Sequence, residues 1–462
     1  MRVSTIFNAA VAASNIKNGI EMAHIKFALP LAFLSGISAT CAFANSELSN
    51  TQGFIENSRF DVTLKNVWMI NTNNQLSEAG IGDQNAWAQG ALLDYQSGWY
   101  RDVIGIDASW YSVVKLYANK DFAGRDLLRD SNGHAEGFNK VGQLYAKLKW
   151  EDEHAYARLY AGWKQLYKFG TLSVTRSRAA PSSWQGVSLE SGWGDFIARA
   201  AWVNRFSKRD EPEKRRFYTL KSNKSIDHIV TGDISWSPNK STRVSWVAGE
   251  SDNYLLRQGI EAQFALPLAE KESLLFRSAW YYNRGLAEWE GARGFTHSAQ
   301  HIFALVGYQY HALESGVAWS KTKAPLENGL GQFYWHMGKN TRGAFNSPAD
   351  GEGNDYVNDN EQMIHWYGKY VISPEVSTGI FANYGFGAKY QGVKLTQWEY
   401  GGFIAWTPNA VPGLSLFTGF GPSYSWKQVK GQPFLTDDKR DFHRSHGIGG
   451  GITLEYKFGL HN

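Results

Sequence analysis

Residues 154–163 read His-Ala-Tyr-Ala-Arg-Leu-Tyr-Ala-Gly-Trp, a stretch in which apolar and polar side chains alternate at every second position. Ala155, Leu159 and Trp163 fall on one face of this stretch, whereas Tyr156 and Arg158 fall on the other. Successive side chains of a β-strand point to opposite sides, so the alternation predicts a strand with one apolar face.

The same alternation recurs along the chain, for example at 141–150, 273–283 and 452–458. Aromatic residues often end the apolar faces, where amphipathic rings suit a lipid–water boundary. The 462 residues include 19 Trp, 23 Tyr and 26 Phe, and this aromatic content excludes a disordered chain. With 47 Gly against 12 Pro, the composition suits long strands closed by tight turns. The mean hydropathy of −0.40 excludes a helical membrane protein.

Compact polar or Pro/Gly-containing breaks separate the alternating segments and predict short turns. There are eight, near 96–101, 151–153, 191–195, 237–240, 267–272, 311–314, 373–375 and 407–413. Each pair of neighbouring breaks encloses two alternating segments, and we expect one longer polar loop between them. In a meander whose two termini both lie at the short-turn end, the number of short turns is half the number of strands minus one. Eight short turns therefore predict about eighteen strands.

We therefore predict an all-β fold, a transmembrane antiparallel up-and-down β-barrel with short periplasmic turns and long extracellular loops. A closed barrel leaves no unpaired sheet edge, and an unpaired edge is not tolerated in lipid. The alternative is a soluble all-β sandwich or propeller. The long spacings between turns and the lack of a blade-length repeat argue against that alternative.

The N-terminus has the features of a secretory signal. Lys26 precedes an apolar stretch at 27–39, and Ala42-Phe43-Ala44 supplies the small residues of a cleavage site. The apolar stretch is too short to predict a membrane-spanning helix.

We expect residues 1–44 to form an N-terminal extension and a cleaved signal peptide, with Met22 as the start of translation. Residues 45–462 would then form a single barrel domain in the bacterial outer membrane, reached through the periplasm. Cleavage would remove Cys41, which is the one cysteine in the chain. A lipoprotein anchor at Cys41 is a weaker alternative, because the residues before it lack the aliphatic side chain that such a signal needs.

Several stretches of the chain carry a family resemblance, and three of them extend over five residues or more. These three are 53–58 (Gly-Phe-Ile-Glu-Asn-Ser), 94–98 (Asp-Tyr-Gln-Ser-Gly) and 177–186 (Ser-Arg-Ala-Ala-Pro-Ser-Ser-Trp-Gln-Gly). In this order they resemble the OprD family of outer-membrane porins. The resemblance implies an eighteen-stranded barrel with a narrow pore, complete in one chain and therefore a monomer. It also implies a basic ladder that guides carboxylate-bearing solutes, and third and seventh loops that fold into the lumen.

On the polar faces of the predicted strands, eight cations point into the lumen. They are Lys115, Lys147, Lys149, Arg158, Arg199, Arg243, Arg257 and Arg277. Later strands supply few such cations, and Glu399 and Glu455 point inward instead. Cations at staggered heights attract a carboxylate at several successive positions, so this basic strip predicts a path for amino acids or other carboxylates. Alternatively, the cations only solvate the lumen and pair with Asp107, Glu190 and Glu261.

The third long loop, predicted at 164–186, carries donors that suit a carboxylate. They are Arg176, Ser177, Arg178, Ser182 and Ser183, beside Trp184. Two guanidinium groups with hydroxyl and backbone donors favour bidentate carboxylate recognition at the constriction. A surface loop that contacts neighbouring loops is the alternative.

The seventh long loop, predicted at 321–361, is acidic and includes Asp350, Glu352 and Asp355. A solvated acidic loop is the better interpretation, because the spacing of these carboxylates matches no EF-hand calcium site. A second hypothesis is that they meet the ammonium end of an amino acid. We expect no cofactor and no resident metal.

These features predict a porin for substrate-selective passive diffusion of small hydrophilic solutes. A sugar-specific porin, similar to a chitoporin-like branch of the same family, is the main alternative, because Tyr145, Tyr156, Tyr160 and Tyr281 point inward and could stack on pyranose rings. No Gly-x-Ser-x-Gly motif or glycine-rich phosphate loop occurs, so we expect no enzyme activity; a barrel hydrolase or an adhesin remains as a lower alternative.

The expected partners follow from an outer-membrane location. They are the solutes, the outer-membrane lipid with lipopolysaccharide, and the barrel-assembly machinery, for which Phe458 would serve as the aromatic signal. The charges nearly balance, with 47 Lys and Arg against 43 Asp and Glu, which argues against a nucleic-acid-binding protein.

Overall fold

The computed structural model describes residues 52–72, 83–122, 124–291 and 294–460. The expected extension, signal peptide and Met22 start lie outside these residues. Almost all of the described secondary structure is β-strand, and the helix α2 (Gln52–Glu56) is a single turn. In the described part of the chain, no helix combines the length and the apolar run needed to cross a bilayer.

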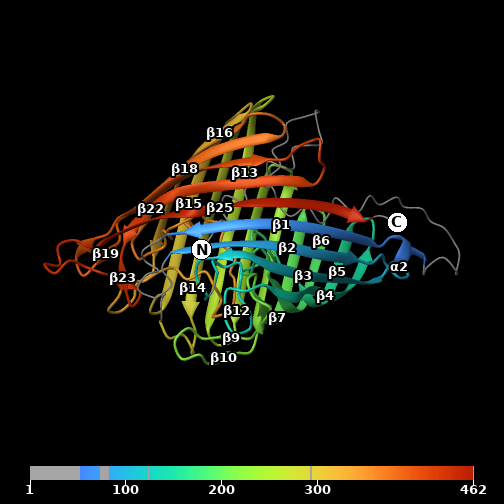
Figure 1. Ribbon diagram of the computed structural model, residues 1–462, viewed down its shortest axis with the longest axis horizontal. Helices are drawn as coiled ribbons and strands as arrows, with labels where there is room; N and C mark the ends of the chain where they lie inside the picture. Colours follow the sequence, from blue (N-terminus) through green and yellow to red (C-terminus); the bar gives the residue numbers. More distant parts are fainter. Residues whose placement is uncertain (1–51, 73–82, 123, 292–293, 461–462) are drawn as a thin grey trace.

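Eighteen antiparallel strands form the wall of a closed barrel (Figure 1). They are β1 (Arg59–Asn71), β2 (Gln84–Gln96), β3 (Ile104–Ala118), β4 (Phe138–Glu151), β5 (Ala155–Lys164), β6 (Ser183–Trp193), β7 (Phe196–Ser207), β11 (Ile229–Asn239), β12 (Thr242–Ser251), β13 (Leu255–Ala269), β14 (Glu272–Gly285), β15 (Ser298–Tyr310), β16 (Leu313–Lys323), β17 (Gln362–Val371), β18 (Val376–Phe386), β21 (Gln397–Trp406), β22 (Leu414–Trp426) and β25 (Arg444–Leu460).

Each of these strands pairs with its neighbours in chain order, and β25 pairs with β1 to close the cylinder. The closing register runs from Phe60 opposite Leu460 to Asn71 opposite Gly449. The remaining strands are two-residue ribbons in the loops: β8 (Lys214–Arg215), β9 (Phe217–Tyr218), β10 (Ser225–Ile226), β19 (Lys389–Tyr390), β20 (Val393–Lys394), β23 (Gln428–Val429) and β24 (Gln432–Pro433). The predicted barrel and its strand number are therefore confirmed.

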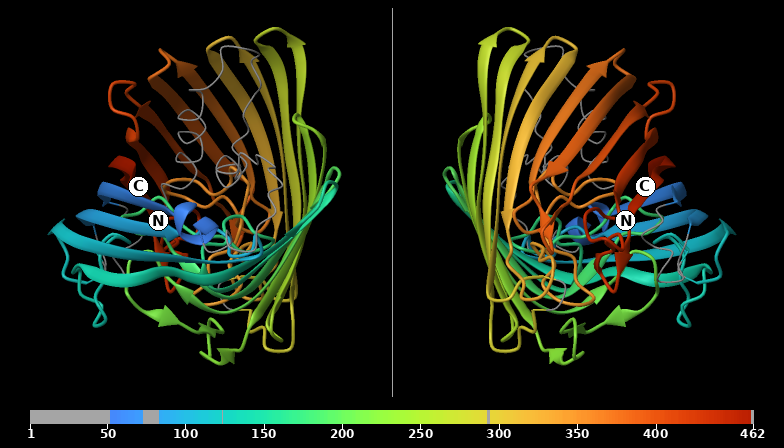
Figure 2. Two further views of the ribbon diagram at one scale, coloured as in Figure 1. Left: turned by 90° about the vertical axis from the view of Figure 1, so that its right-hand side faces the viewer. Right: turned by 90° about the vertical axis from the view of Figure 1, so that its left-hand side faces the viewer.

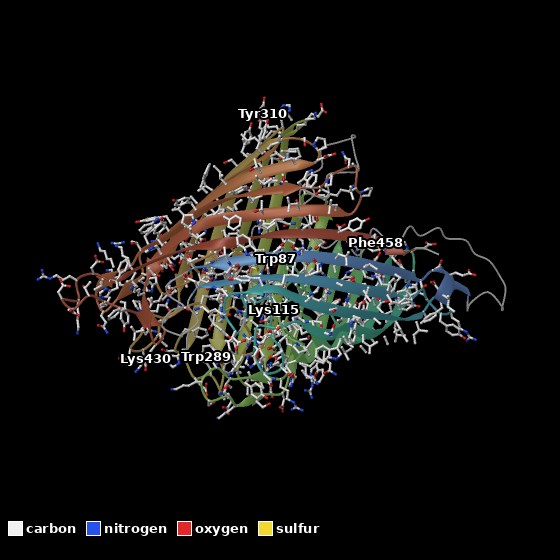
Figure 3. All side chains as sticks on the ribbon, viewed as in Figure 1. Trp87, Lys115, Trp289, Tyr310, Lys430 and Phe458 are labelled. Atoms are coloured by element: carbon white, nitrogen blue, oxygen red, sulfur yellow. The ribbon has the colours of Figure 1, made fainter. Side chains whose placement is uncertain are left out.

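The alternation of the sequence sorts side chains between the outer face and the lumen. On β13, the Ile260 side chain is 48% exposed on the outer face, whereas Arg257 on the inner face is 1% exposed. Tyr308 and Tyr310 lie at the short-turn end of β15, and Figure 3 shows Tyr310 at the end of the barrel opposite Lys430. Large apolar side chains cover the outer surface, as lipid requires.

All eight predicted short turns connect consecutive strands at one end of the barrel. The expectation of a longer loop in every interval is wrong at one place, because only residues 252–254 join β12 to β13. Asn253 adopts a positive φ of 51° there, and the Tyr254 amide donates to Ser251 O at 2.9 Å. A tight turn of this kind needs a residue that tolerates the left-handed region, and Asn does so.

The third and seventh loops enter the barrel, and the seventh is also the longest connection between described wall strands. The third loop is residues 165–182, between β5 and β6, and the seventh loop is residues 324–361, between β16 and β17. Ser183 and Trp184, expected in the third loop, instead begin β6. In both views of Figure 2, loop segments lie inside the ring of strands.

Candidate pore constriction

The third and seventh loops are joined to each other inside the barrel. Leu172 and Gly343 form an antiparallel bridge. The Ser173 amide donates to Arg342 O at 3.0 Å, and the Ala344 amide donates to Thr171 O at 2.8 Å. Two loops that enter from different strands therefore form one partition in the lumen.

The tip of the third loop is held by the inner face of β11. The Gly170 amide donates to Asp233 Oδ2 at 2.7 Å, and the Thr171 amide donates to Thr231 Oγ1 at 2.8 Å. Gly170 has a positive φ of 54°, and a Cβ there would lie 2.3 Å from Thr231 Oγ1. Glycine is therefore needed both for the backbone conformation and for the close approach to the wall.

The other half of the third loop reaches β1 and β2, next to the pairing of β25 with β1 that closes the barrel. Lys65 Nζ of β1 donates to Arg176 O at 2.6 Å. Ala179 lies directly over β2, where a Cβ on Gly90 would come within 2.2 Å of Ala179 O. The loop thus crosses the lumen from β11 to β1 and β2.

The seventh loop is held by polar side chains of β13 and β14. The Arg257 guanidinium donates to Trp335 O and, at 2.6 Å, to Ala344 O. Asn283 Nδ2 donates to Tyr334 O at 2.6 Å. Backbone carbonyls of a loop inside a barrel need donors, and these inward side chains supply them.

On the opposite wall, Glu399 of β21 binds the acidic part of the seventh loop. Its carboxylate accepts the amides of Glu352 at 3.1 Å, Gly353 at 2.7 Å and Asn354 at 3.2 Å. Asn383 Nδ2 of β18 donates to the same carboxylate at 2.7 Å. Hydrogen bonds to a charged group are the stronger class, so Glu399 is a main anchor of the seventh loop.

Sequence reasoning placed Glu399 in the lumen but missed this anchoring role. A signal was present, because Gly351 precedes the bonded amides and Gly353 supplies one of them. A Cβ on Gly351 would lie 1.9 Å from Glu399 Oε1, so the loop approaches the carboxylate through glycine. Sequence alone gave no partner for those glycines.

The structure places all eight cations of the predicted basic strip on the inner face of the barrel. Five of them contact carboxylates: Lys115 with Glu136 at 2.6 Å, Lys147 with Asp107 at 2.7 Å, Lys149 with Asp102 at 2.6 Å, Arg158 with Glu151 at 3.7 Å, and Arg199 with Asp233 at 2.8 Å. Arg199 also donates to Lys168 O at 2.6 Å and so holds the third loop. These five cations are at least partly neutralised.

The other three cations of the strip bind neutral acceptors. Arg243 donates to Ser245 Oγ at 3.0 Å and to Ser235 Oγ at 2.8 Å, and Arg277 donates to Asn346 O at 3.3 Å. Arg257 binds the seventh-loop carbonyls described above. Within the described ranges, none of the three has a carboxylate oxygen within 4 Å. Arg257 is buried under the seventh loop, so Arg243 and Arg277 are the two whose charge can act on a solute.

Lys168 adds a cation to this group that sequence reasoning missed. It lies in the third loop, beyond β5, where a polar residue carries no alternation signal. Burial, together with repulsion from Arg277 and Arg243, lowers the pKa of the Lys168 ammonium to about 8. Lys168 thus adds its charge to the field of Arg277 and Arg243.

Of the six third-loop residues expected at the constriction, Arg176 has the arrangement that best suits a solute. Its guanidinium packs over the Tyr167 ring at 4.6 Å from the ring centre, and its Nε donates to Gln165 Oε1 at 3.1 Å. The side chain is half-buried and lacks a carboxylate partner among the described residues. Carboxylate binding by this loop is therefore a proposal that depends mainly on Arg176.

The other residues of that set make internal contacts. Ser177 Oγ accepts a bond from Arg178 at 2.9 Å, and Ser182 Oγ accepts the Thr175 amide at 2.8 Å. Trp184 donates through Nε1 to Ser173 O at 3.0 Å, and Ser183 is fully buried beside it. These contacts hold the loop in shape, and no solute is needed to explain them.

The expected acidic residues of the seventh loop lie close together. Asp350 and Asp355 form an antiparallel backbone bridge, and Glu352 between them contributes its amide to Glu399. Among the described residues, no group of three or more His, Cys, Asp or Glu side chains could hold a metal ion. The backbone of this segment is thus organised by Glu399.

Four inward tyrosines were expected as a sugar path, and the structure places them beside cations. Tyr156 has Arg158 over its ring at 4.7 Å, Tyr160 has Lys164 at 4.1 Å, Tyr145 has Lys164 at 5.6 Å, and Tyr281 has Arg257 at 5.2 Å. Ring faces that contact cations are less available for stacking on a sugar.

Comparisons with known proteins agree with this architecture. The family model described as outer membrane porin, OprD family, matches residues 52–363. Porin D of Pseudomonas aeruginosa is 27% identical over 294 residues, a match that covers 58% of this chain and 61% of that porin. The chain thus spans about three fifths of that relative's length.

Solved structures share the fold at low sequence identity. OccAB3 of Acinetobacter baumannii is similar with a TM-score of 0.71 and 15% identity, covering 88% of this chain and 100% of that chain. OpdK of Pseudomonas aeruginosa, solved with vanillate, is similar with a TM-score of 0.69 and 14% identity, again covering 88% of this chain and 100% of that chain.

Proposed function

The chain belongs to the OprD family of outer membrane porins, and on that basis we propose that it lets small hydrophilic solutes diffuse passively and selectively across the bacterial outer membrane. The channel is complete in one chain, with the short turns in the periplasm and the long loops outside the cell. Its preferred solutes carry a carboxylate, as amino acids do.

The observation that supports this proposal is the composition of one lumen wall beside the constriction. Arg243 and Arg277 bind only neutral acceptors, and Lys168 and Arg176 bring two further cations from the third loop. Cations in a confined lumen attract anions at several positions without a single tight site, so a carboxylate passes along the wall. Vanillate, with which OpdK was solved, is itself a carboxylate.

A saccharide path is the second candidate, and the inward tyrosines favour it. Tyr156 and Tyr160 both face the lumen from β5. Each of them has a cation over its ring, so the same two side chains serve a carboxylate path better than a neutral sugar path. We therefore rank the saccharide below the carboxylate.

The proposal is tested by single-channel recording of the purified protein in a planar bilayer. We expect discrete conductance steps with anion preference, and block by an amino acid rather than by an N-acetylglucosamine oligomer. Block by the oligomer alone would favour a saccharide-specific porin over a carboxylate-specific one. A folded protein that passes no current would contradict the channel itself.

The role of the wall is tested by the double substitution Arg243→Gln with Arg277→Gln. We expect the reversal potential in a salt gradient to move towards cation preference, because two charges without carboxylate partners are removed. Lys430→Gln is the matched control, since Lys430 is exposed at the tip of the β23–β24 hairpin, outside the lumen (Figure 3). Equal shifts in both proteins would contradict the guiding role.

A further inference from the structure

Three cations lie on the outer side of the barrel wall, at the long-loop ends of strands whose outer faces are otherwise mainly apolar. Arg284 follows Trp280 on the outward face of β14, and Lys321 and Lys323 follow Trp319 on the outward face of β16. The side chains of all three cations are exposed. We call Arg284, Lys321 and Lys323 the outer cation patch.

The strand register brings the three cations close together. Lys323 on β16 is opposite Gln300 on β15, and Arg284 on β14 is opposite Ser298, two residues nearer the long loop. Strands are about 4.8 Å apart and rise about 3.3 Å per residue, so the Cα atoms of Arg284 and Lys323 are roughly 12 Å apart. Lysine and arginine side chains are long enough to reach one multiply charged anion from these positions.

The outer cation patch keeps its positive charge. Within the described ranges, none of the three cations makes an ion pair or a side-chain hydrogen bond. Toward the long-loop end of β12–β18, the outward carboxylate nearest in register is Glu250 of β12, which is opposite Leu256 and therefore two strands from Arg284. Glu288, four residues after Arg284, instead contacts Lys224 at 2.5 Å.

A row of tryptophans shows where the patch lies relative to the hydrocarbon of the membrane. The indole Nε1 of Trp280 donates to Gln300 Oε1 at 3.3 Å, and that of Trp319 donates to Gln362 Oε1 at 3.1 Å. Both glutamines lie nearer the long-loop end than the tryptophans that bind them. Indole rings at a membrane boundary direct the N–H group to the wet side, so the cations lie at the level of the lipid headgroups.

Another sector of the wall has a similar aromatic arrangement without such cations. On β1 and β2, Trp68 Nε1 donates to Asn85 Oδ1 at 2.6 Å, again toward the long-loop end. The next outward residue of β1 is Ile70, and the exposed Asp83 precedes β2. A polar rim above the tryptophans therefore does not by itself require cations, and those on β14 and β16 need a separate reason.

We propose that the outer cation patch docks the phosphate groups of a lipopolysaccharide molecule in the outer leaflet. The lipid A part of lipopolysaccharide carries its phosphates where the headgroup meets the acyl chains, which is the level of cations just beyond a tryptophan row. Lysine binds a phosphate as a point charge, and arginine binds it through two nitrogens. This inference rests on the proposed function for its orientation, with the long loops outside the cell.

The test is a titration of the purified, detergent-solubilised protein with lipid A that carries two phosphates, with bound lipid counted by native mass spectrometry. The triple variant Arg284→Gln, Lys321→Gln and Lys323→Gln should bind about a hundredfold more weakly, since each cation near an anionic lipid surface contributes about fivefold. Lipid A with one phosphate should bind the unmodified protein more weakly than the form with two. That difference should shrink in the triple variant.

The matched control removes three exposed lysines from the connection between β22 and β25, through Lys427→Gln, Lys430→Gln and Lys439→Gln. The net charge falls by the same amount at the same end of the barrel, but these residues lie beyond the strands of the wall. Their lipid A affinity should stay within about twofold of the unmodified protein, because salt screens charges that are not in contact with the lipid. Lys321→Arg with Lys323→Arg keeps the charge and should retain the affinity.

Three outcomes would overturn the docking site. One is equal lipid A affinity in the unmodified protein and the triple variant. Another is an equal loss in the control, because net charge and not position would then decide the binding. The last is displacement of lipid A by inorganic phosphate at an equal concentration, which would indicate a site for a free anion.

Single-channel recording on the same preparations separates this inference from the porin function. The three side chains face lipid, so the triple variant should keep the conductance of the unmodified protein. A conducting channel that does not bind lipid A refutes the docking site alone, whereas a silent barrel that binds lipid A refutes the porin function alone.

Discussion

Two walls of the same barrel face each other across the lumen with different side chains. The inner face of β3–β14 carries the basic strip together with inward tyrosines. On β18, β21, β22 and β25, small residues recur on the inner face: Ser377, Gly379, Gly401, Gly419, Gly421, Ser423, Ser425, Ser445, Gly449 and Gly451. The outer faces of both walls are apolar alike. Lipid therefore constrains one side of every strand, while the lumen side is free to differ around the barrel.

Each wall also contributes charged anchors to the constriction, and the anchors of the two walls are opposite in sign. Arg199 of the basic wall holds the third loop through Asp233 and Lys168 O. Glu399 of the small-residue wall holds the seventh loop through three amides. The cations of the basic strip that remain after anchoring, Arg243 and Arg277, lie on the basic wall, so this side of the lumen is the more positive.

The largest effect is expected when the small-residue wall loses its anchor. Glu399→Gln should lower the free energy of unfolding by about 4 kcal/mol, because a buried carboxylate that accepts four hydrogen bonds is replaced. Single-channel conductance should rise as the seventh loop moves away from the wall. Denaturant unfolding and bilayer recording measure the two effects.

Glu375→Gln is the control for that substitution. Glu375 also accepts a backbone amide, from Asn409 at 3.0 Å, but does so in a short turn at the other end of the barrel. An equal rise in conductance in both variants would show that the seventh loop is not held by Glu399.

The next effect concerns the anchor on the basic wall. Arg199→Gln should lower the free energy of unfolding by about 3 kcal/mol, since its two-nitrogen contact with Asp233 and its bond to the third loop are lost. Conductance should increase, and anion preference should fall. Arg158→Gln removes the same charge two strands away, on β5, from a side chain with no printed bond to the third loop, and it should change the preference while leaving conductance nearly constant. Identical conductance in the two variants would contradict the anchoring role.

Two glycines of the small-residue wall differ in how closely the neighbouring strand approaches them. Gly421 and Gly449 are opposite each other in register on β22 and β25. A Cβ on Gly421 would lie 2.0 Å from Tyr400 O, whereas a Cβ on Gly449 meets nothing within 4 Å. Gly421→Ser should destabilise the barrel by about 2 kcal/mol, and Gly449→Ser should change its stability by less than about 0.5 kcal/mol.

Conductance distinguishes the two roles of these glycines. Gly449→Ser should narrow the lumen slightly, because the new side chain projects into open space. Thermal unfolding and conductance of both variants provide the check. Equal losses of stability in Gly421→Ser and Gly449→Ser would mean that the small residues of this wall are required by strand geometry alone.

The smallest effect is a graded response to pH on the basic wall. Lys168 carries its charge below its lowered pKa of about 8 and loses it above that value. Anion preference should therefore decline as the pH rises through 8, and reversal potentials at pH 6, 8 and 10 should record a shift of a few millivolts. Lys168→Met should flatten this part of the profile. A profile that Lys168→Met leaves unchanged would assign the titration to another group.

Local sequence patterns were sufficient to predict the strands and short turns of the barrel wall. The eight breaks are confirmed as short turns because each is set by polar, Pro or Gly residues over a few positions. The inward direction of Arg257 and Glu399 followed from alternation alone, since a strand has only two faces. The three-residue connection at 252–254 was missed because Asp, Asn and Tyr have a composition that fits a tight turn and a longer loop equally well.

The roles of the inward side chains were beyond the reach of the sequence. Arg199 and Arg257 hold loops, whereas Arg243 binds two serines. The spacing of these three arginines in the sequence does not predict this difference. Arg178 and Arg209 both approach Asp126, although these residues are 31 to 83 positions apart along the chain. Such contacts are set by how loops fold back into the lumen.

The sequence by itself determined the number of strands, the face that each side chain takes and the sign of charge along each wall. These properties depend on a period of two and on local turns, which act over a few residues at a time. Only the tertiary structure decided which charges anchor the third and seventh loops and which stay available to a solute. Those outcomes depend on which wall side chains form hydrogen bonds with the backbone of loops inside the lumen. The distance between two residues along the chain does not indicate these pairings.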